Sequence, residues 1–103
     1  MRLRLTGRGT GITPELDGFA RRRIYFALAR FAGRIRSVAI RLADANGPRG
    51  GMDKHCDILI TTGAGRALVV RERQAGFHAA VAMAAERAGR AVARQLDLER
   101  GTR

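Results

Sequence analysis

Residues 76–99, GFHAAVAMAAERAGRAVARQLDLE, constrain the fold more than any other stretch of this chain. The segment is rich in alanine and contains no proline, which favours a long helix. Its apolar positions recur at helical spacing and predict a single buried stripe: Phe77, Val81, Ala84, Ala88, Val92, followed by Gln95 and Leu96. A helix with one apolar stripe must cover an apolar surface elsewhere in the chain.

A second stripe lies beside the first, because Met83, Arg87, Arg90 and Arg94 are spaced 4, 3 and 4 residues apart. The three guanidinium groups fall within about 10 Å of helix axis at a rise of 1.5 Å per residue. Arginine on a solvated helix face is the ordinary interpretation. We favour a nucleic-acid interface, because guanidinium groups match phosphates in shape and charge and the interleaved Glu86 is expected to point elsewhere.

The charge balance supports a polyanionic partner. The chain has 20 Lys and Arg against 9 Asp and Glu, a net charge of +11 and a pI near 11.8. RNA, DNA and anionic lipid are the partners that such a charge favours. No apolar run reaches the roughly 18 residues that cross a bilayer, so no membrane-spanning segment is expected. A membrane is not among the expected partners. The single cysteine and the absence of an apolar leader predict a cytoplasmic protein without disulfides.

Four shorter segments alternate apolar and polar residues, as strands with one buried face do. They span residues 2–6, 35–43, 55–62 and 66–73. Their predicted core positions are Leu3, Leu5, Val38, Ile40, Leu42, Cys56, Ile58, Ile60, Leu68 and Val70. Gly63-Ala64-Gly65 predicts a tight turn, residues 44–54 a long connection, and Gly7, Gly9 and Gly11 a loop that carries Arg8.

Another helix is predicted from Thr13 to about Ala32. Thr13 supplies an N-cap, Pro14 fits the first helical position, and Gly33 ends the helix. Its predicted buried face consists of Leu16, Ala20, Ile24, Ala27, Leu28 and Phe31.

The predicted fold is therefore an α+β, two-layer β-α-β-β-β-α sandwich, in which both helices cover one face of a four-stranded sheet. Residues 1–99 are expected to form a single RNA-binding domain and residues 100–103 a frayed C-terminal tail. Because both helices carry arginines, the cleft between them is expected to be the most positive part of the molecule.

A ridge on the first helix alternates rings and cations: Phe19, Arg23, Phe26 and Arg30. We interpret both phenylalanines as boundary residues that pack on the sheet edge, and Arg23 and Arg30 as RNA contacts. The predicted RNA-binding set is Arg87, Arg90, Arg94, Arg23, Arg30, Arg22 and Arg8.

No matched catalytic set is present in the sequence, so an enzyme is not expected. Strand alternation places Cys56 on the opposite face from His55 and Asp57, which favours a core cysteine over a nucleophile. Asp53, His55 and Asp57 lack a second ligand pair for a metal, and GRGTG lacks the lysine of a phosphate-binding loop. No cofactor, metal or small-molecule substrate is expected.

The order and spacing of several short motifs resemble the family of ribosome hibernation factors, namely the hibernation promoting factor and ribosome-associated inhibitor A family. The matching residues are Thr6-Gly7-Arg8, Ile12-Thr13-Pro14-Glu15-Leu16, Arg34-Ile35-Arg36-Ser37-Val38, Phe77, Ala79-Ala80-Val81, Glu86-Arg87, Arg90 and Val92. The resemblance covers nearly the whole chain and implies the same β-α-β-β-β-α fold.

The resemblance also implies a function. Family members bind the small ribosomal subunit where tRNA and mRNA would lie and silence translation under stress. Their basic positions fall here on Arg87, Arg90, Arg94 and Arg23; the next two fall on Phe26 and Ala29, unless a one-residue insertion brings Arg30 into place. The protein is expected to be a monomer when free. The alternative is a general RNA- or DNA-binding module of the same architecture without a ribosomal role.

Overall fold

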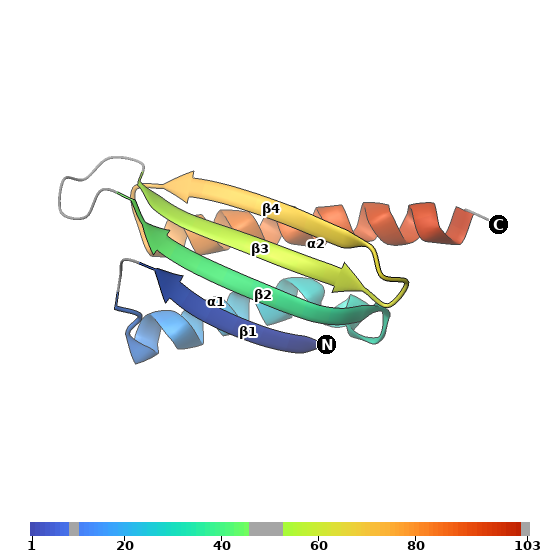
Figure 1. Ribbon diagram of the computed structural model, residues 1–103, viewed down its shortest axis with the longest axis horizontal. Helices are drawn as coiled ribbons and strands as arrows, with labels where there is room; N and C mark the ends of the chain where they lie inside the picture. Colours follow the sequence, from blue (N-terminus) through green and yellow to red (C-terminus); the bar gives the residue numbers. More distant parts are fainter. Residues whose placement is uncertain (9–10, 46–52, 102–103) are drawn as a thin grey trace.

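The computed structural model describes residues 1–8, 11–45 and 53–101. Four strands form one sheet in the order β1-β2-β3-β4 (Figure 1). In chain order the elements are β1 (Arg2–Arg8), α1 (Pro14–Leu28), the 3-10 helix η1 (Ala29–Arg34), β2 (Ile35–Asp44), β3 (Lys54–Thr62), β4 (Ala67–Gln74) and α2 (Phe77–Gly101). The predicted β-α-β-β-β-α order is therefore confirmed.

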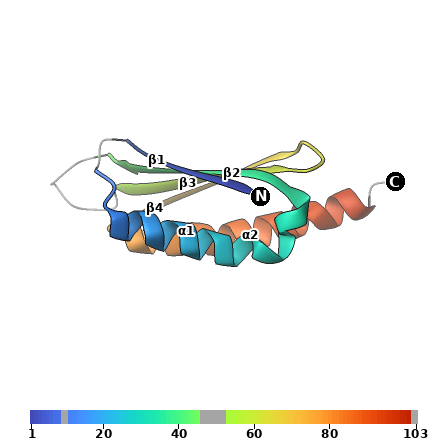
Figure 2. The same ribbon diagram turned by 90° about the horizontal axis from the view of Figure 1, so that it is seen from below.

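The sheet is mixed. β1 pairs parallel to β2, and the chain crosses between them through α1, whereas the β2–β3 and β3–β4 pairs are antiparallel. Figure 2 shows both helices on the same side of the sheet, side by side. The molecule is thus a two-layer sandwich, and the second face of the sheet is left open.

The core lies between the two layers. Val38, Ile40 and Leu42 of β2 stand opposite Ile60, Ile58 and Cys56 of β3, and all six side chains are buried. The helices complete the core with the following buried residues: Leu16, Ala20, Ile24 and Leu28 of α1, and Ala80, Val81, Ala84, Ala85, Ala88, Val92 and Leu96 of α2. Burial of this apolar area is the main stabilising contribution to the fold.

The start of α1 agrees with the prediction, and its end does not. Thr13 Oγ1 accepts a hydrogen bond of 3.1 Å from the Leu16 backbone N–H, and Pro14 is the first helical residue. The α-helix ends at Leu28 and continues as the 3-10 helix η1 up to Arg34, because a tighter last turn leads the chain into β2. A β-bulge between Ile35 and Ser37 then shifts the alternation, so that Ile35 is also buried.

Two boundaries near the ends of the chain extend beyond their predictions. Gly7 and Arg8 belong to β1 and pair with Leu42 and Ala43 of β2, rather than forming a loop. Helix α2 continues to Gly101, so Arg100 and Gly101 are helical. Its last turns are held by Glu99, whose Oε2 accepts hydrogen bonds from Thr62 Oγ1 at 2.9 Å and Gln95 Nε2 at 3.2 Å.

Some predicted loop and tail positions lie outside the described residues: 9 and 10, 46–52, and 102 and 103. The predicted turn at 63–65 is present, and Gly65 adopts a φ of +91°, which favours glycine. Within the described part of the chain, no helix is long and apolar enough to cross a membrane.

Candidate nucleic-acid interface

A groove runs along the solvent side of the two packed helices. One part is lined by Arg23, Phe26, Ala27, Arg30, Ala85, Glu86, Gly89 and Arg90. The other part is lined by Arg30, Phe31, Arg34, Ala93, Leu96, Asp97 and Arg100. Because Arg30 lines both parts, we treat them as one feature and call it the helix groove. Its five arginines outnumber its two acids, so a positive potential is expected there.

Small residues on both helices form the floor of the helix groove. A Cβ atom added to Gly89 would lie 3.3 Å from the carbonyl oxygen of Ala27, so the two backbones approach closely at this point. Ala85 and Ala93 add only methyl groups. The longer arginine side chains therefore line the sides of the groove, and small residues line its bottom.

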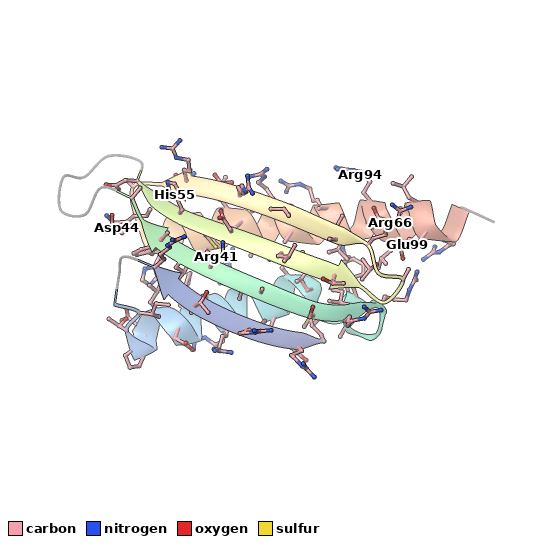
Figure 3. The ribbon with its side chains drawn as sticks, in the orientation of Figure 1. Arg41, Asp44, His55, Arg66, Arg94 and Glu99 are labelled. Atoms are coloured by element: carbon pink, nitrogen blue, oxygen red, sulfur yellow. The ribbon has the colours of Figure 1, made fainter. Side chains whose placement is uncertain are left out.

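The structure divides the predicted stripe on α2. Arg90 lines the helix groove, where its Nη1 lies 3.1 Å from Oε1 of Glu86, one turn earlier. The expectation that Glu86 points elsewhere was therefore wrong, since side chains four residues apart on a helix are neighbours. Arg94 has no ion pair or hydrogen bond among the described side chains, and Figure 3 shows it projecting from α2 on the side away from α1.

Arg87 turns toward the sheet instead of the groove. Its Nη1 lies 2.8 Å from Oε2 of Glu72 and donates a hydrogen bond of 2.6 Å to the backbone carbonyl of Arg71, both on β4. The hydrogen bond that Arg87 Nη1 donates to Glu72 Oε2 is the main reason that the pKa of Glu72 lies below its ordinary value. Arg87 thus joins α2 to the edge strand of the sheet.

The predicted arginines of the first part of the chain also separate. Arg23 and Arg30 line the helix groove, and the guanidinium of Arg30 lies 4.6 Å from the centre of the Phe31 ring. Arg22 is exposed on α1 beside Gly18. Arg8 ends β1, next to Ala43 of β2, and so lies on the sheet rather than on a helix.

The two phenylalanines of the α1 ridge differ in environment. Phe19 is partly buried against the core, and its ring centre lies 4.5 Å from that of His78, which agrees with a packing role. Phe26 is 85% exposed at the helix groove, so its predicted packing on the sheet edge was wrong. The reason is its angular position on α1, which faces the groove rather than the sheet.

Sequence reasoning missed the open face of the sheet. The outward positions of the strands carry Arg2, Arg4, Arg8, Arg41, Arg71 and Arg73, with Asp57 as the acid among these described positions. Register places Arg41, Asp57 and Arg71 in one row across three strands, and a shallow hollow lies over this row. Figure 3 shows Arg41 on this face. Strand alternation already assigned several of these arginines outward, and that was the available signal.

Cys56 lies in the core, as predicted, with none of its surface exposed. Burial is the main cause that raises the pKa of its thiol to about 12, so the thiol stays protonated at neutral pH and is a poor nucleophile. Asp53 is buried beside Lys54, with 3.3 Å between its Oδ1 and the lysine Nζ. Over the described ranges, no cluster of three or more His, Cys, Asp or Glu side chains is arranged to hold a metal ion.

Two solved structures resemble this chain over most of its length. The N-terminal domain of Protein Y from Thermus thermophilus is 21% identical with a TM-score of 0.75, and the match covers 91% of this chain and 98% of that one. A ribosomal subunit interface protein from Coxiella burnetii is 14% identical with a TM-score of 0.76, covering 94% and 99%. At these identities the two structures establish the fold alone. No curated protein shows significant sequence similarity.

A match to a family model shows the protein family of this chain in addition to its fold. Residues 3–98 match the model described as "Sigma 54 modulation protein / S30EA ribosomal protein", which covers both helices and all four strands. Because the match spans nearly the whole sequence, this chain belongs to the Sigma 54 modulation protein / S30EA ribosomal protein family.

Proposed function

We propose that this protein is a ribosome-associated hibernation factor, which binds the RNA of the small subunit near the decoding region and thereby inhibits translation. Membership of the S30EA ribosomal protein family supports a ribosomal role. The observation that carries the proposal is the helix groove, because it gathers Arg23, Arg30 and Arg90 from two helices around one concave surface. Residues 1–99 would act as a single RNA-binding domain.

The groove can bind RNA through its phosphate backbone. Guanidinium groups form paired hydrogen bonds with phosphate oxygens, and each neutralised phosphate releases condensed counterions, which drives association. Arg23 and Arg30 on one wall and Arg90 on the other can hold one strand between them. Arg22 on α1 and Arg94 on the side of α2 away from α1 are both exposed and would add phosphate contacts outside the groove.

Inhibition then requires no catalysis. A protein that occupies the RNA surface on which mRNA and tRNA would lie excludes both by volume. Its effect should be stoichiometric and reversible, and salt should weaken it because the contacts are to phosphates. The thiol of Cys56 would have no part in this function, since it is buried.

Co-sedimentation tests the proposal. The protein is centrifuged through density gradients with isolated small subunits, isolated large subunits and bulk RNA, at low and moderate salt, and translation is measured in parallel in a cell-free extract. We expect saturable one-to-one binding to the small subunit that persists at moderate salt and slows translation. Cys56→Ala serves as a control and should leave both readouts unchanged.

The alternative function is a general RNA- or DNA-binding module. The arginines on the open sheet face favour it, because they add positive charge outside the helix groove. Binding that spreads over all RNA and disappears at moderate salt would support this alternative and contradict the ribosomal role.

A further inference from the structure

Phe26 is exposed to an unusual degree for an aromatic side chain. Its exposed fraction is 85%, the largest among the exposed large hydrophobic residues of the described chain, compared with 56% for the adjacent Tyr25. A phenylalanine ring has no polar group, so a partner that covered it would remove apolar surface from water and gain binding free energy. The surroundings of Phe26 indicate what that partner is.

Three arginines line the same part of the helix groove as the ring. Arg23 lies three residues before Phe26 on α1, and Arg30 lies four residues after it in η1; both line the part of the helix groove that Phe26 lines. Arg90 lines the same groove from α2, and the floor beneath is Gly89. An apolar ring flanked by cations on two helices fits a ligand that is flat and apolar at one end and anionic at the other.

A nucleotide has this construction. Its base offers a flat π face that stacks on aromatic side chains, and its phosphates carry the negative charge that guanidinium groups bind. A lipid or an acidic peptide would supply the charge without the flat face. Glu86, the acid in this part of the groove, is paired with Arg90 and does not reverse the sign of the charge there.

We propose that Phe26 is the stacking platform of a nucleobase-binding subsite, on which one unpaired base of an RNA strand lies while Arg23, Arg30 and Arg90 hold the adjacent phosphates. The subsite rests on the proposed function and deepens it: the groove takes single-stranded rather than fully paired RNA. Stacking tolerates any base, so the subsite selects unpaired nucleotides without reading sequence.

Affinity for a short single-stranded RNA tests this subsite directly. Fluorescence anisotropy with an end-labelled oligonucleotide compares the wild type with Phe26→Ala, Phe26→Leu and Phe26→Trp. We expect Phe26→Ala to weaken binding by about 5- to 150-fold, the loss of one base–aromatic stack. Phe26→Leu is the matched control, because it keeps apolar surface but removes the ring, and it should bind as weakly as Phe26→Ala.

The tryptophan variant gives a second readout. The natural chain contains no tryptophan, so the indole at position 26 is the sole one, and RNA binding should quench its fluorescence while affinity is retained. An oligonucleotide with the same phosphates but no bases should bind the wild type and Phe26→Ala equally. The salt dependence of binding should be the same for both proteins, because no phosphate contact is lost.

The outcomes separate the subsite from the function on which it rests. Equal affinity of the wild type, Phe26→Ala and Phe26→Leu, with an Arg23, Arg30 and Arg90 triple alanine variant weakened, would overturn the subsite and leave backbone binding intact. Equal affinity of all variants including the triple one would overturn both. Since Phe26 is largely exposed, its variants should unfold at the wild-type temperature, and circular dichroism checks this.

Discussion

The helix groove and the open sheet face are both rich in arginine, yet they differ in form. The arginines of the groove come from α1, η1 and α2, and an exposed phenylalanine ring lies among them. On the sheet face the arginines alternate along strands, and the central row is apolar: Ala39, Leu59 and Val69 are neighbours across β2, β3 and β4. The described residues of this face include no Phe, Tyr or Trp side chain, and His55 is its one aromatic ring.

The difference teaches that net charge indicates a class of partner but does not locate the site. A charge of +11 spread over both faces attracts RNA toward either one and raises association rates. Stable docking also requires a surface on which bases can stack, and the exposed Phe26 ring supplies one in the groove. Outward arginine on the sheet has a simpler explanation, since residues on the solvent face of an antiparallel strand are commonly polar.

Two matched triple variants test whether the helix groove, rather than the sheet face, is the RNA-binding site. Arg23, Arg30 and Arg90→Ala removes three charges from the groove, and Arg4, Arg41 and Arg73→Ala removes three from the sheet face. We expect the groove variant to lose on the order of 100-fold in affinity for small subunits, with the salt slope reduced by about 2 to 3. The sheet variant should lose less than about 10-fold.

Filter binding over a salt series measures both quantities. Because the two variants have equal net charge, a purely electrostatic, site-independent interaction predicts equal losses. Equal losses, or a larger loss for the sheet variant, would show that the groove is not the RNA-binding site.

Single alanine variants at Arg94 and Arg87 distinguish an arginine that binds RNA from an arginine that stabilises the fold. Arg94 has no partner among the described side chains, so Arg94→Ala should weaken RNA binding about 5-fold, the value of one phosphate contact, and leave stability unchanged. Arg87 pairs with Glu72, so Arg87→Ala should instead lower the free energy of unfolding by about 1 kcal/mol. Urea unfolding and RNA titration of both variants measure their stability and their affinity for RNA. A loss of stability in Arg94→Ala, with a loss of RNA affinity alone in Arg87→Ala, would contradict this assignment.

The sequence predicted the fold well, because each element repeats a local pattern. Alternation predicted the buried faces of β2 and β3, and helical spacing predicted most of those of α1 and α2, although Ala80 and Ala85 were missed. The candidate site was harder to predict. Helical spacing placed Arg87 in line with Arg90, but Glu72 lies on another element, and only the packing of α2 against β4 brings the two charges together.

Phe26 and the open sheet face were missed for a related reason. Periodicity gives the angle of a residue on its helix, and the depth of its burial depends on how far the neighbouring element extends. Gly89 has no side chain that could cover Phe26. This exposure depends on how the two helices pack together, which the periodicity of one helix does not give.

The ion pair between Glu86 and Arg90 offers a smaller test within the groove. Glu86→Gln removes the acid that now pairs with Arg90 and leaves the side chain nearly the same size. Arg90 then becomes free to bind a phosphate, and the local negative charge is gone, so affinity for RNA should rise by about 2- to 3-fold with a steeper salt dependence. Asp57→Asn on the sheet face is the matched control and should change affinity less. A Glu86→Gln protein that binds RNA more weakly would contradict this role.

The smallest expected effect concerns pH, at the edge strand where the two faces meet. Arg87 holds the pKa of Glu72 below its ordinary value of 4.5, so the folded protein favours the charged carboxylate. This contribution to stability is fully present above the unfolded-state pKa and is lost as the pH falls through the lower folded-state pKa.

Glu72→Gln keeps a hydrogen-bond acceptor for Arg87 without the charge. The wild type should therefore be more stable than Glu72→Gln by about 0.5 kcal/mol at pH 7, and the difference should shrink as the pH falls below 4.5. Urea unfolding of both proteins from pH 7 downward measures it. A difference that stays constant across this range would mean that Glu72 and Arg87 are not coupled as an ion pair, and that Arg87 remains available to RNA with Arg90 and Arg94.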